Sequence, residues 1–85
     1  ITLSPGDLIL MAGERSSLLF LIHRGLIEKC NADGSKSLGI ISTGQYFNEC
    51  ALLYIETSNA NYIANTFCHL FTLSKFDFEQ KNHLI

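Results

Sequence analysis

Gly44-Gln45-Tyr46-Phe47-Asn48-Glu49-Cys50-Ala51-Leu52-Leu53 is the stretch of this 85-residue chain in which the residue pattern changes most sharply. A turn at Thr43-Gly44 opens it, because glycine readily adopts the positive φ that many tight turns require. Residues 48–54 (NECALLY) include few β-branched residues, so this segment is predicted to form a short helical turn. Segments rich in Leu, Ile, Phe and Tyr lie on both sides, and the helical turn therefore interrupts a β-rich chain.

Turn signals separate the apolar segments on either side of this stretch. Ser4-Pro5-Gly6-Asp7 is a strong turn signal, Arg24-Gly25 marks a tight break, and Asp33-Gly34 is predicted to close a hairpin. Near the end of the chain, residues 74–77 (SKFD) resemble a helix capping box with Asp in place of Glu or Gln. The predicted strands are 8–11, 18–23, 26–31, 37–41, 60–65 and 68–73, and the predicted C-terminal helix is 75–84. This rhythm favours an all-β sandwich or roll over a parallel sheet.

Composition indicates a single small globular domain. The chain is 47% hydrophobic and only 16% charged, which is too apolar for a disordered tail. A net charge of −2, with six Lys and Arg residues scattered along the chain, disfavours nucleic-acid binding. The longest apolar run, residues 18–22, is far too short to span a bilayer. The chain starts without Met and stops inside a predicted helix, so we expect residues 1–85 to be one domain of a larger protein, truncated at both ends.

Residue types that bind metals or act in catalysis occur without the spacing that such chemistry needs. Metal-binding cysteines usually come in pairs two to four residues apart, whereas the cysteines here are widely separated, and they are predicted to be free thiols that pack as small hydrophobes. Each histidine is predicted to stand alone, and no serine has a Gly-x-Ser-x-Gly setting. The residues concerned are Cys30, Cys50, Cys68, His23, His69 and His83. The sequence therefore predicts no enzyme, no metal site and no cofactor.

Taken in order, the glycines and the central stretch resemble the cyclic-nucleotide-binding domain family. The matching residues are Pro5-Gly6-Asp7, Gly13-Glu14, Gly25, residues 44–49, Ala51-Leu52-Leu53, Ala60 and Ala64. The resemblance implies a mostly β fold: an eight-stranded, jelly-roll-like β-roll with a short helix in its phosphate-binding cassette and a C-terminal helix. Residues 66–78 are similar to the intracellular domains of cyclic-nucleotide-gated and hyperpolarisation-activated channels, and sperm-type sodium–proton exchangers carry similar domains.

The resemblance also implies a ligand site for cAMP or cGMP. In the family, a glutamate accepts the ribose 2′-hydroxyl, and Glu49 stands at its position. Backbone N–H groups at the start of the cassette helix bind the cyclic phosphate, and Cys50 and Ala51 would supply them. The candidate site residues are Phe47, Asn48, Glu49, Cys50, Ala51, Ser58, Asn59 and Ala60.

Four positions depart from the family pattern. Asn48 replaces a glycine, although Asn tolerates positive φ better than other side chains do. Ser58 stands where an arginine pairs with the phosphate, and losing such a buried contact costs on the order of 2–5 kcal/mol, or roughly 30- to 3,000-fold in affinity. Asn59 replaces a Thr or Ser. Tyr62 replaces a Val. Its ring could fill the pocket itself, but we expect a half-exposed ring that packs on the sheet.

These observations predict a regulatory, non-enzymatic domain with weak or no cAMP or cGMP binding. Its expected location is the cytoplasmic part of a channel or transporter, its expected partner is the rest of that chain, and we expect it to insert into no membrane. One alternative is a working sensor that binds nucleotide through Glu49 and neutral donors at Ser58 and Asn59. Another is a purely structural or oligomerisation module. A DNA-binding regulator would need a helix-turn-helix after the roll.

Overall fold

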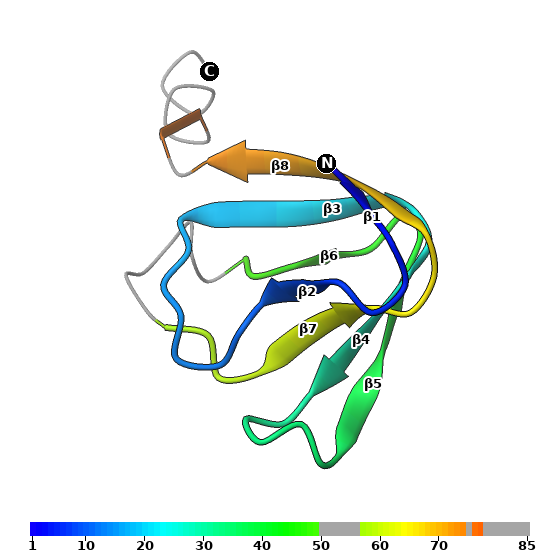
Figure 1. Cartoon of the computed structure of the whole chain (residues 1–85). Coiled ribbons are helices and arrows are strands. Elements are labelled where there is room, and N and C mark those ends of the chain that lie inside the picture. Colours follow the sequence, from blue (N-terminus) through cyan, green and yellow to red (C-terminus); the bar gives the residue numbers. More distant parts are fainter. Residues whose placement is uncertain (50–56, 75, 78–85) are drawn as a thin grey trace.

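The computed structural model describes residues 1–49, 57–74 and 76–77, and it confirms the mostly β fold (Figure 1). The strands are short and antiparallel. They are β1 (Thr2–Leu3), β2 (Leu8–Leu10), β3 (Leu18–Arg24), β4 (Leu26–Cys30), β5 (Ser37–Ser42), β6 (Tyr46–Phe47), β7 (Asn61–Ala64) and β8 (Cys68–Ser74). The predicted cassette helix falls mostly on residues outside the described ranges.

The strands form two four-stranded sheets that face each other. One sheet has the order β1-β8-β3-β6 and the other the order β2-β7-β4-β5, so neighbours in space are often distant in sequence. Figure 1 shows β8 and β3 on one side of the fold and β4 and β5 on the other. Alternation of buried and more exposed residues is clearest in β3 and β7. In β3, for example, Phe20 and Ile22 are buried while Leu21 and His23 are exposed.

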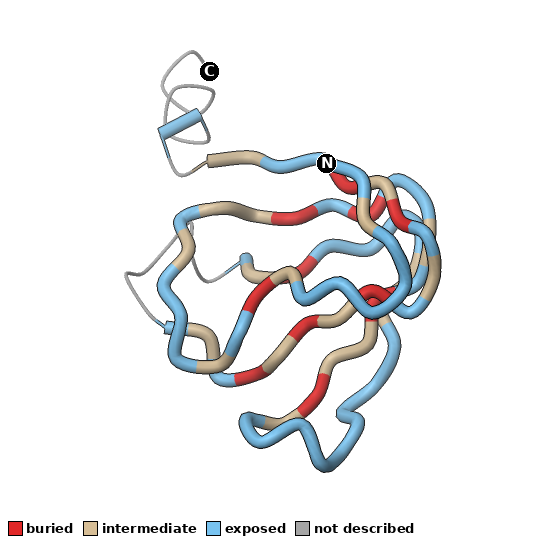
Figure 2. Tube along the Cα trace, in the orientation of Figure 1, coloured by how far each residue is buried: buried red, intermediate tan, exposed pale blue. Residues whose placement is uncertain are grey.

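The core lies between the two sheets and draws residues from both (Figure 2). Its buried members are mostly aliphatic or aromatic, with small alanines where the layers approach closely. They are Leu10, Phe20, Ile22, Ile27, Phe47, Ala60, Tyr62, Ala64, Cys68 and Leu70. Cys30 and Cys68 are buried and unpaired, which confirms their interpretation as small hydrophobes, whereas Cys50 lies outside the described residues.

Two of the predicted turns and the predicted helix cap have the expected geometry. Gly25 has a φ of 111°, which fits the break between β3 and β4. In the β4–β5 hairpin, Gly34 has a φ of 75°, and the Ser35 N–H donates to an Asp33 carboxylate oxygen over 2.9 Å. The Asp77 N–H donates to the Ser74 hydroxyl oxygen over 3.0 Å, as a helix cap requires. The predicted helix at 75–84 otherwise lies almost wholly outside the described residues.

The strands missing from the prediction are the two-residue strands β1 and β6. β6 pairs through Phe47 with Phe20 and through Tyr46 with Leu21. Strands this short carry no detectable alternation, so local sequence patterns do not indicate them. Within the described residues, no helix has the length and apolar character needed to cross a membrane.

Candidate functional site

The described candidate residues fall in two segments at one end of the roll. Phe47, Asn48 and Glu49 end β6 and lead into the cassette, while Ser58, Asn59 and Ala60 lead into β7. Phe47 stacks on Tyr62, two residues beyond Ala60, with ring centroids 4.6 Å apart, and this contact connects the two segments. Cys50 and Ala51 lie outside the described residues.

Asn48 keeps the backbone conformation that the family's glycine would have. Its φ is 67°, the one positive φ of a residue other than glycine in the described part of the chain. The side-chain amide donates to the Leu18 carbonyl over 2.8 Å, which ties the start of the cassette to the start of β3. This confirms that Asn48 preserves the turn.

Glu49 is exposed, and its carboxylate makes no hydrogen bond or ion pair with another described residue. Its carboxylate therefore caps no described residue. An exposed carboxylate of this kind can accept hydrogen bonds from a ligand hydroxyl. Asn59 is exposed in the same way.

Ser58 is held by its own neighbourhood. Its hydroxyl donates to the Ala60 carbonyl over 2.6 Å, and its oxygen lies 3.3 Å from the Ala60 N–H, which donates to it. The backbone of Ser58 is fixed as well, since its N–H donates to the Glu14 carbonyl and its carbonyl accepts from Gly13. The hydroxyl and the buried Ala60 N–H are thus occupied within the loop.

Three aromatic rings stack across the interior of the roll. The Phe20 and Phe47 centroids are 5.0 Å apart and those of Phe47 and Tyr62 are 4.6 Å apart, each pair at an interplanar angle of 15°. Phe20 and Phe47 belong to one sheet and Tyr62 to the other, so the stack joins the two layers. The Lys29 ammonium lies 5.9 Å from the Tyr62 centroid on the neighbouring strand.

The expectation of a half-exposed Tyr62 is wrong, because only 7% of this residue is exposed. Tyr62 shares the buried face of β7 with Ala64, and Ala60, just before the strand, is buried as well. Sequence alone did not reveal the ring's position, since the stacking partners come from strands far away in the chain.

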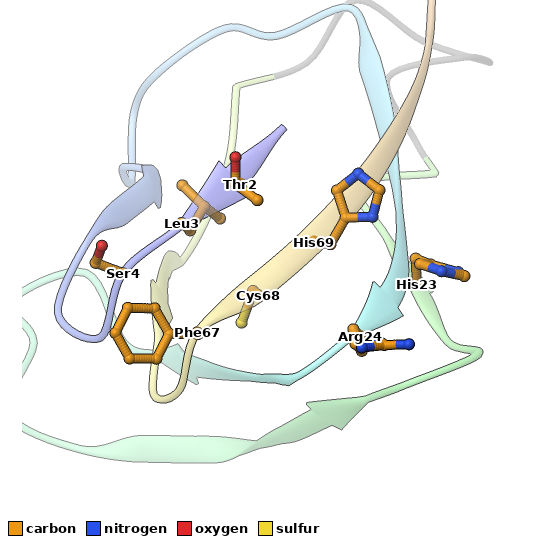
Figure 3. Close-up of a pocket in the computed structure, with 8 residues that line it drawn as sticks. All are labelled: Thr2, Leu3, Ser4, His23, Arg24, Phe67, Cys68 and His69. Atoms are coloured by element: carbon orange, nitrogen blue, oxygen red, sulfur yellow. The ribbon is translucent and has the colours of Figure 1, made fainter.

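The expectation that each histidine stands alone is also wrong for two of them. The rings of His23 and His69 lie 5.3 Å apart, centroid to centroid, and both contact Phe71. His83 lies outside the described residues. The two rings line an open pocket of about 520 Å³ that none of the candidate site residues lines (Figure 3). No group of three or more potential metal ligands occurs among the described residues.

Together, the two facing sheets and the positive φ of Asn48 after β6 define an antiparallel β-roll. A family model described as "Cyclic nucleotide-binding domain" matches residues 1–81, and the chain belongs to this family.

Curated relatives of the chain are ion channels. It is 32% identical over 80 residues to the human cyclic nucleotide-gated channel alpha-3, covering 87% of this chain and 12% of the channel. It is also 32% identical over 76 residues to the mouse potassium/sodium hyperpolarization-activated cyclic nucleotide-gated channel 2, covering 89% of this chain and 9% of the channel. The chain thus spans about a tenth of the length of these relatives.

Solved structures share the same fold. Cyclic-AMP-bound PfPKA-R superposes with a TM-score of 0.85 at 26% identity, covering 94% of this chain and 28% of that one. The regulatory subunit of a cAMP-independent protein kinase A from Trypanosoma brucei gives a TM-score of 0.84 at 26% identity, covering 94% and 29%. The Thermus thermophilus catabolite activator protein, at 21% identity and a TM-score of 0.89 with coverage of 99% and 41%, shows the likeness of fold alone.

Proposed function

We propose that this domain is a regulatory, non-catalytic module whose cyclic-nucleotide site binds its ligand weakly or not at all. The observation that carries the proposal is the hydrogen bonding of the Ser58 hydroxyl. Ser58 occupies the position at which the family resemblance implies a phosphate-binding arginine, and its hydroxyl is bonded to Ala60 on both its donor and acceptor sides. No cation therefore meets the phosphate from this position.

Two further features reduce the space and the contacts available to a nucleotide. Asn48 places a side chain where a glycine would let the backbone approach the ligand, and its amide is held by Leu18. The Tyr62 ring, buried against Phe47, occupies part of the interior between the sheets. Like the absence of an arginine at position 58, both features weaken nucleotide binding.

The proposed host is a channel or transporter with this domain on its cytoplasmic side. Support comes from the channel relatives, which match most of this chain. Regulation then requires the roll to favour one arrangement of the flanking segments over another, because a contact that is equal in both states shifts no equilibrium. The stack of Phe20, Phe47 and Tyr62 would stabilise one such arrangement without any ligand.

A nucleotide titration followed by two-dimensional NMR tests the proposal. Labelled protein is titrated with cAMP and, separately, with cGMP, up to about 5 mM, and the backbone signals of Asn48, Glu49 and Ala60 are followed. We expect either no saturable shift or a dissociation constant in the millimolar range, about −4 kcal/mol. A micromolar dissociation constant for either nucleotide would overturn the proposal and support the alternative, a working sensor that uses Glu49 and neutral donors.

A further inference from the structure

A β-bulge in β3 gathers three basic side chains at one end of its sheet. Ile22 pairs with Leu70 and Arg24 pairs with His69, so His23 is an extra residue on β3. Two residues of β3 consequently face one residue of β8. His23 and Arg24 are exposed and His69 is partly exposed, so all three side chains reach the surface.

These side chains form one side of the open pocket of about 520 Å³. In Figure 3, β8 runs through the middle with His69, while Thr2 and Ser4 lie on one side of it and His23 and Arg24 on the other. The volume falls within the range of small-molecule sites, roughly 300–1,000 Å³. Phe67, which is 76% exposed, adds an apolar surface at the pocket.

The lining offers hydrogen-bond donors and positive charge and includes no carboxylate. The Arg24 guanidinium makes no ion pair within the part of the chain that the structure describes, and its planar fork matches the oxygens of a phosphate. The hydroxyls of Thr2 and Ser4 and the rings of His23 and His69 are further donors.

The charged groups on the adjoining segments do not neutralise the positive charge of the pocket. The strands next to β8 and β3, which are β1 and β6, contain no charged residue. The Asp7 carboxylate is engaged by the Ser4 N–H over 2.8 Å, and the Ile1 amino group donates to the Leu70 carbonyl. A metal ion fits this pocket less well, because the two histidines have no third protein ligand among the described residues and Arg24 repels cations.

We propose that this pocket is a second ligand site, separate from the cassette, and that it binds a small organic phosphate. Arg24 pairs with the phosphate oxygens, the two imidazoles donate to them, and Phe67 contacts the organic part. Asn48 contacts the Leu18 end of β3, whereas Arg24 ends that strand six residues later, which separates the sites by about 20 Å. The proposal is therefore independent of whether the cassette binds nucleotide.

Titration of the labelled 85-residue chain with phenyl phosphate and with inorganic phosphate, at constant ionic strength, tests this site. Saturable shifts are expected at Thr2, His23, Arg24 and His69, with tighter binding of phenyl phosphate. Arg24→Gln should weaken binding at least about tenfold, equivalent to 1.4 kcal/mol. The matched control is Lys36→Gln, which removes an exposed charge in the β4–β5 hairpin and should change the affinity less than about twofold.

The double variant His23→Gln/His69→Gln separates the role of the histidines from that of Arg24. Both imidazole rings line the pocket and contact each other, so this variant should bind phenyl phosphate at least about threefold more weakly than the parent chain does.

The proposal is overturned if phosphate shifts spread over all Lys and Arg residues, or if either Arg24→Gln or the double histidine variant binds phenyl phosphate as tightly as the parent does. Spectra of each variant report whether the core signals of Ile27 and Leu70 are unchanged, so that loss of binding is distinguished from loss of the fold. Cyclic-nucleotide shifts at Asn48 and Ala60 belong to the cassette, so failure of one proposal leaves the other testable.

Discussion

Gly25 is the one glycine of the chain at which an added Cβ would clash with its surroundings. A Cβ built on it would lie 2.6 Å from the Cys68 sulfur and 2.7 Å from the Phe67 carbonyl oxygen, and its φ is 111°. Gly13 has a φ of 86°, but a Cβ there would meet nothing within 4 Å. Substitutions at Gly13 and Gly25 therefore distinguish the cost of backbone strain alone from the cost of strain combined with a steric clash.

We expect Gly13→Ala to lower the free energy of unfolding by about 1–2 kcal/mol, the cost of a left-handed conformation for a residue with a Cβ. Gly25→Ala should cost clearly more, because the β3–β4 turn must also move away from Cys68. Urea unfolding of both variants measures the difference. Equal losses would show that the turn relaxes freely and that close packing on Cys68 is unimportant.

Asp33 provides a pH-dependent prediction at the same scale. Hydrogen bonds from the Ser35 side chain and the Ser35 N–H lower the pKa of this carboxyl below its ordinary value. Its stabilising effect on the hairpin is thus present above the unfolded-state pKa and is lost as the pH falls through the lower folded-state pKa. NMR titration should show a depressed pKa for Asp33, and Ser35→Ala should raise it. An unchanged value in Ser35→Ala would contradict the assigned cause.

At the scale of strands and sheets, the stack of Phe20, Phe47 and Tyr62 holds the two layers together. Tyr62→Val removes a buried ring from the interior, and the cavity left behind should lower the free energy of unfolding by about 2–4 kcal/mol. Phe71→Val is the control, because Phe71 is 49% exposed on the outer face and should lose less than about 1 kcal/mol. Thermal or urea unfolding compares them, and similar losses would mean that the stack contributes no more than surface packing.

Local signals in the sequence were sufficient for elements whose determinants lie close together in the chain. The Asp33-Gly34 hairpin and the Ser74 helix cap each depend on neighbouring residues, and each was predicted. Pairings between strands that are distant in the chain could not be predicted from local sequence signals. The two-residue strand β6, the burial of Tyr62 on Phe47 and the contact between His23 and His69 all depend on strand order and on a register shift in β3.

In the candidate site, too, locally determined features could be predicted and features that depend on distant parts of the chain could not. Positive φ at Asn48 followed from the chemistry of that one residue and was confirmed. The closed hydrogen bonds of Ser58 depend on the conformation of the loop before β7, which no local pattern specifies. Nothing in the sequence pointed to the pocket at the His23 end of β3, since its lining comes from three strands and two turns.

On the scale of the whole molecule, the roll has the family fold, and Ser58 stands at the position for which the family resemblance implies an arginine. Two facing sheets keep the residues that lead into the cassette and into β7 at one end of the roll, while the basic pocket lies at the other end of β3. The proposed regulatory role requires a difference in stability between two arrangements of the domain, whether a ligand or its own side chains set that difference.

The affinity of Ser58→Arg for cAMP, compared with that of the parent chain, tests the central claim most directly. Asn59→Arg is the matched control, because it adds the same charge one residue away on an exposed position. Calorimetry or NMR titration should show a gain of at least about tenfold for Ser58→Arg, or 1.4 kcal/mol, and less than about twofold for Asn59→Arg. No gain in Ser58→Arg, or an equal gain in both variants, would contradict the claim that the missing charge at this position weakens the site.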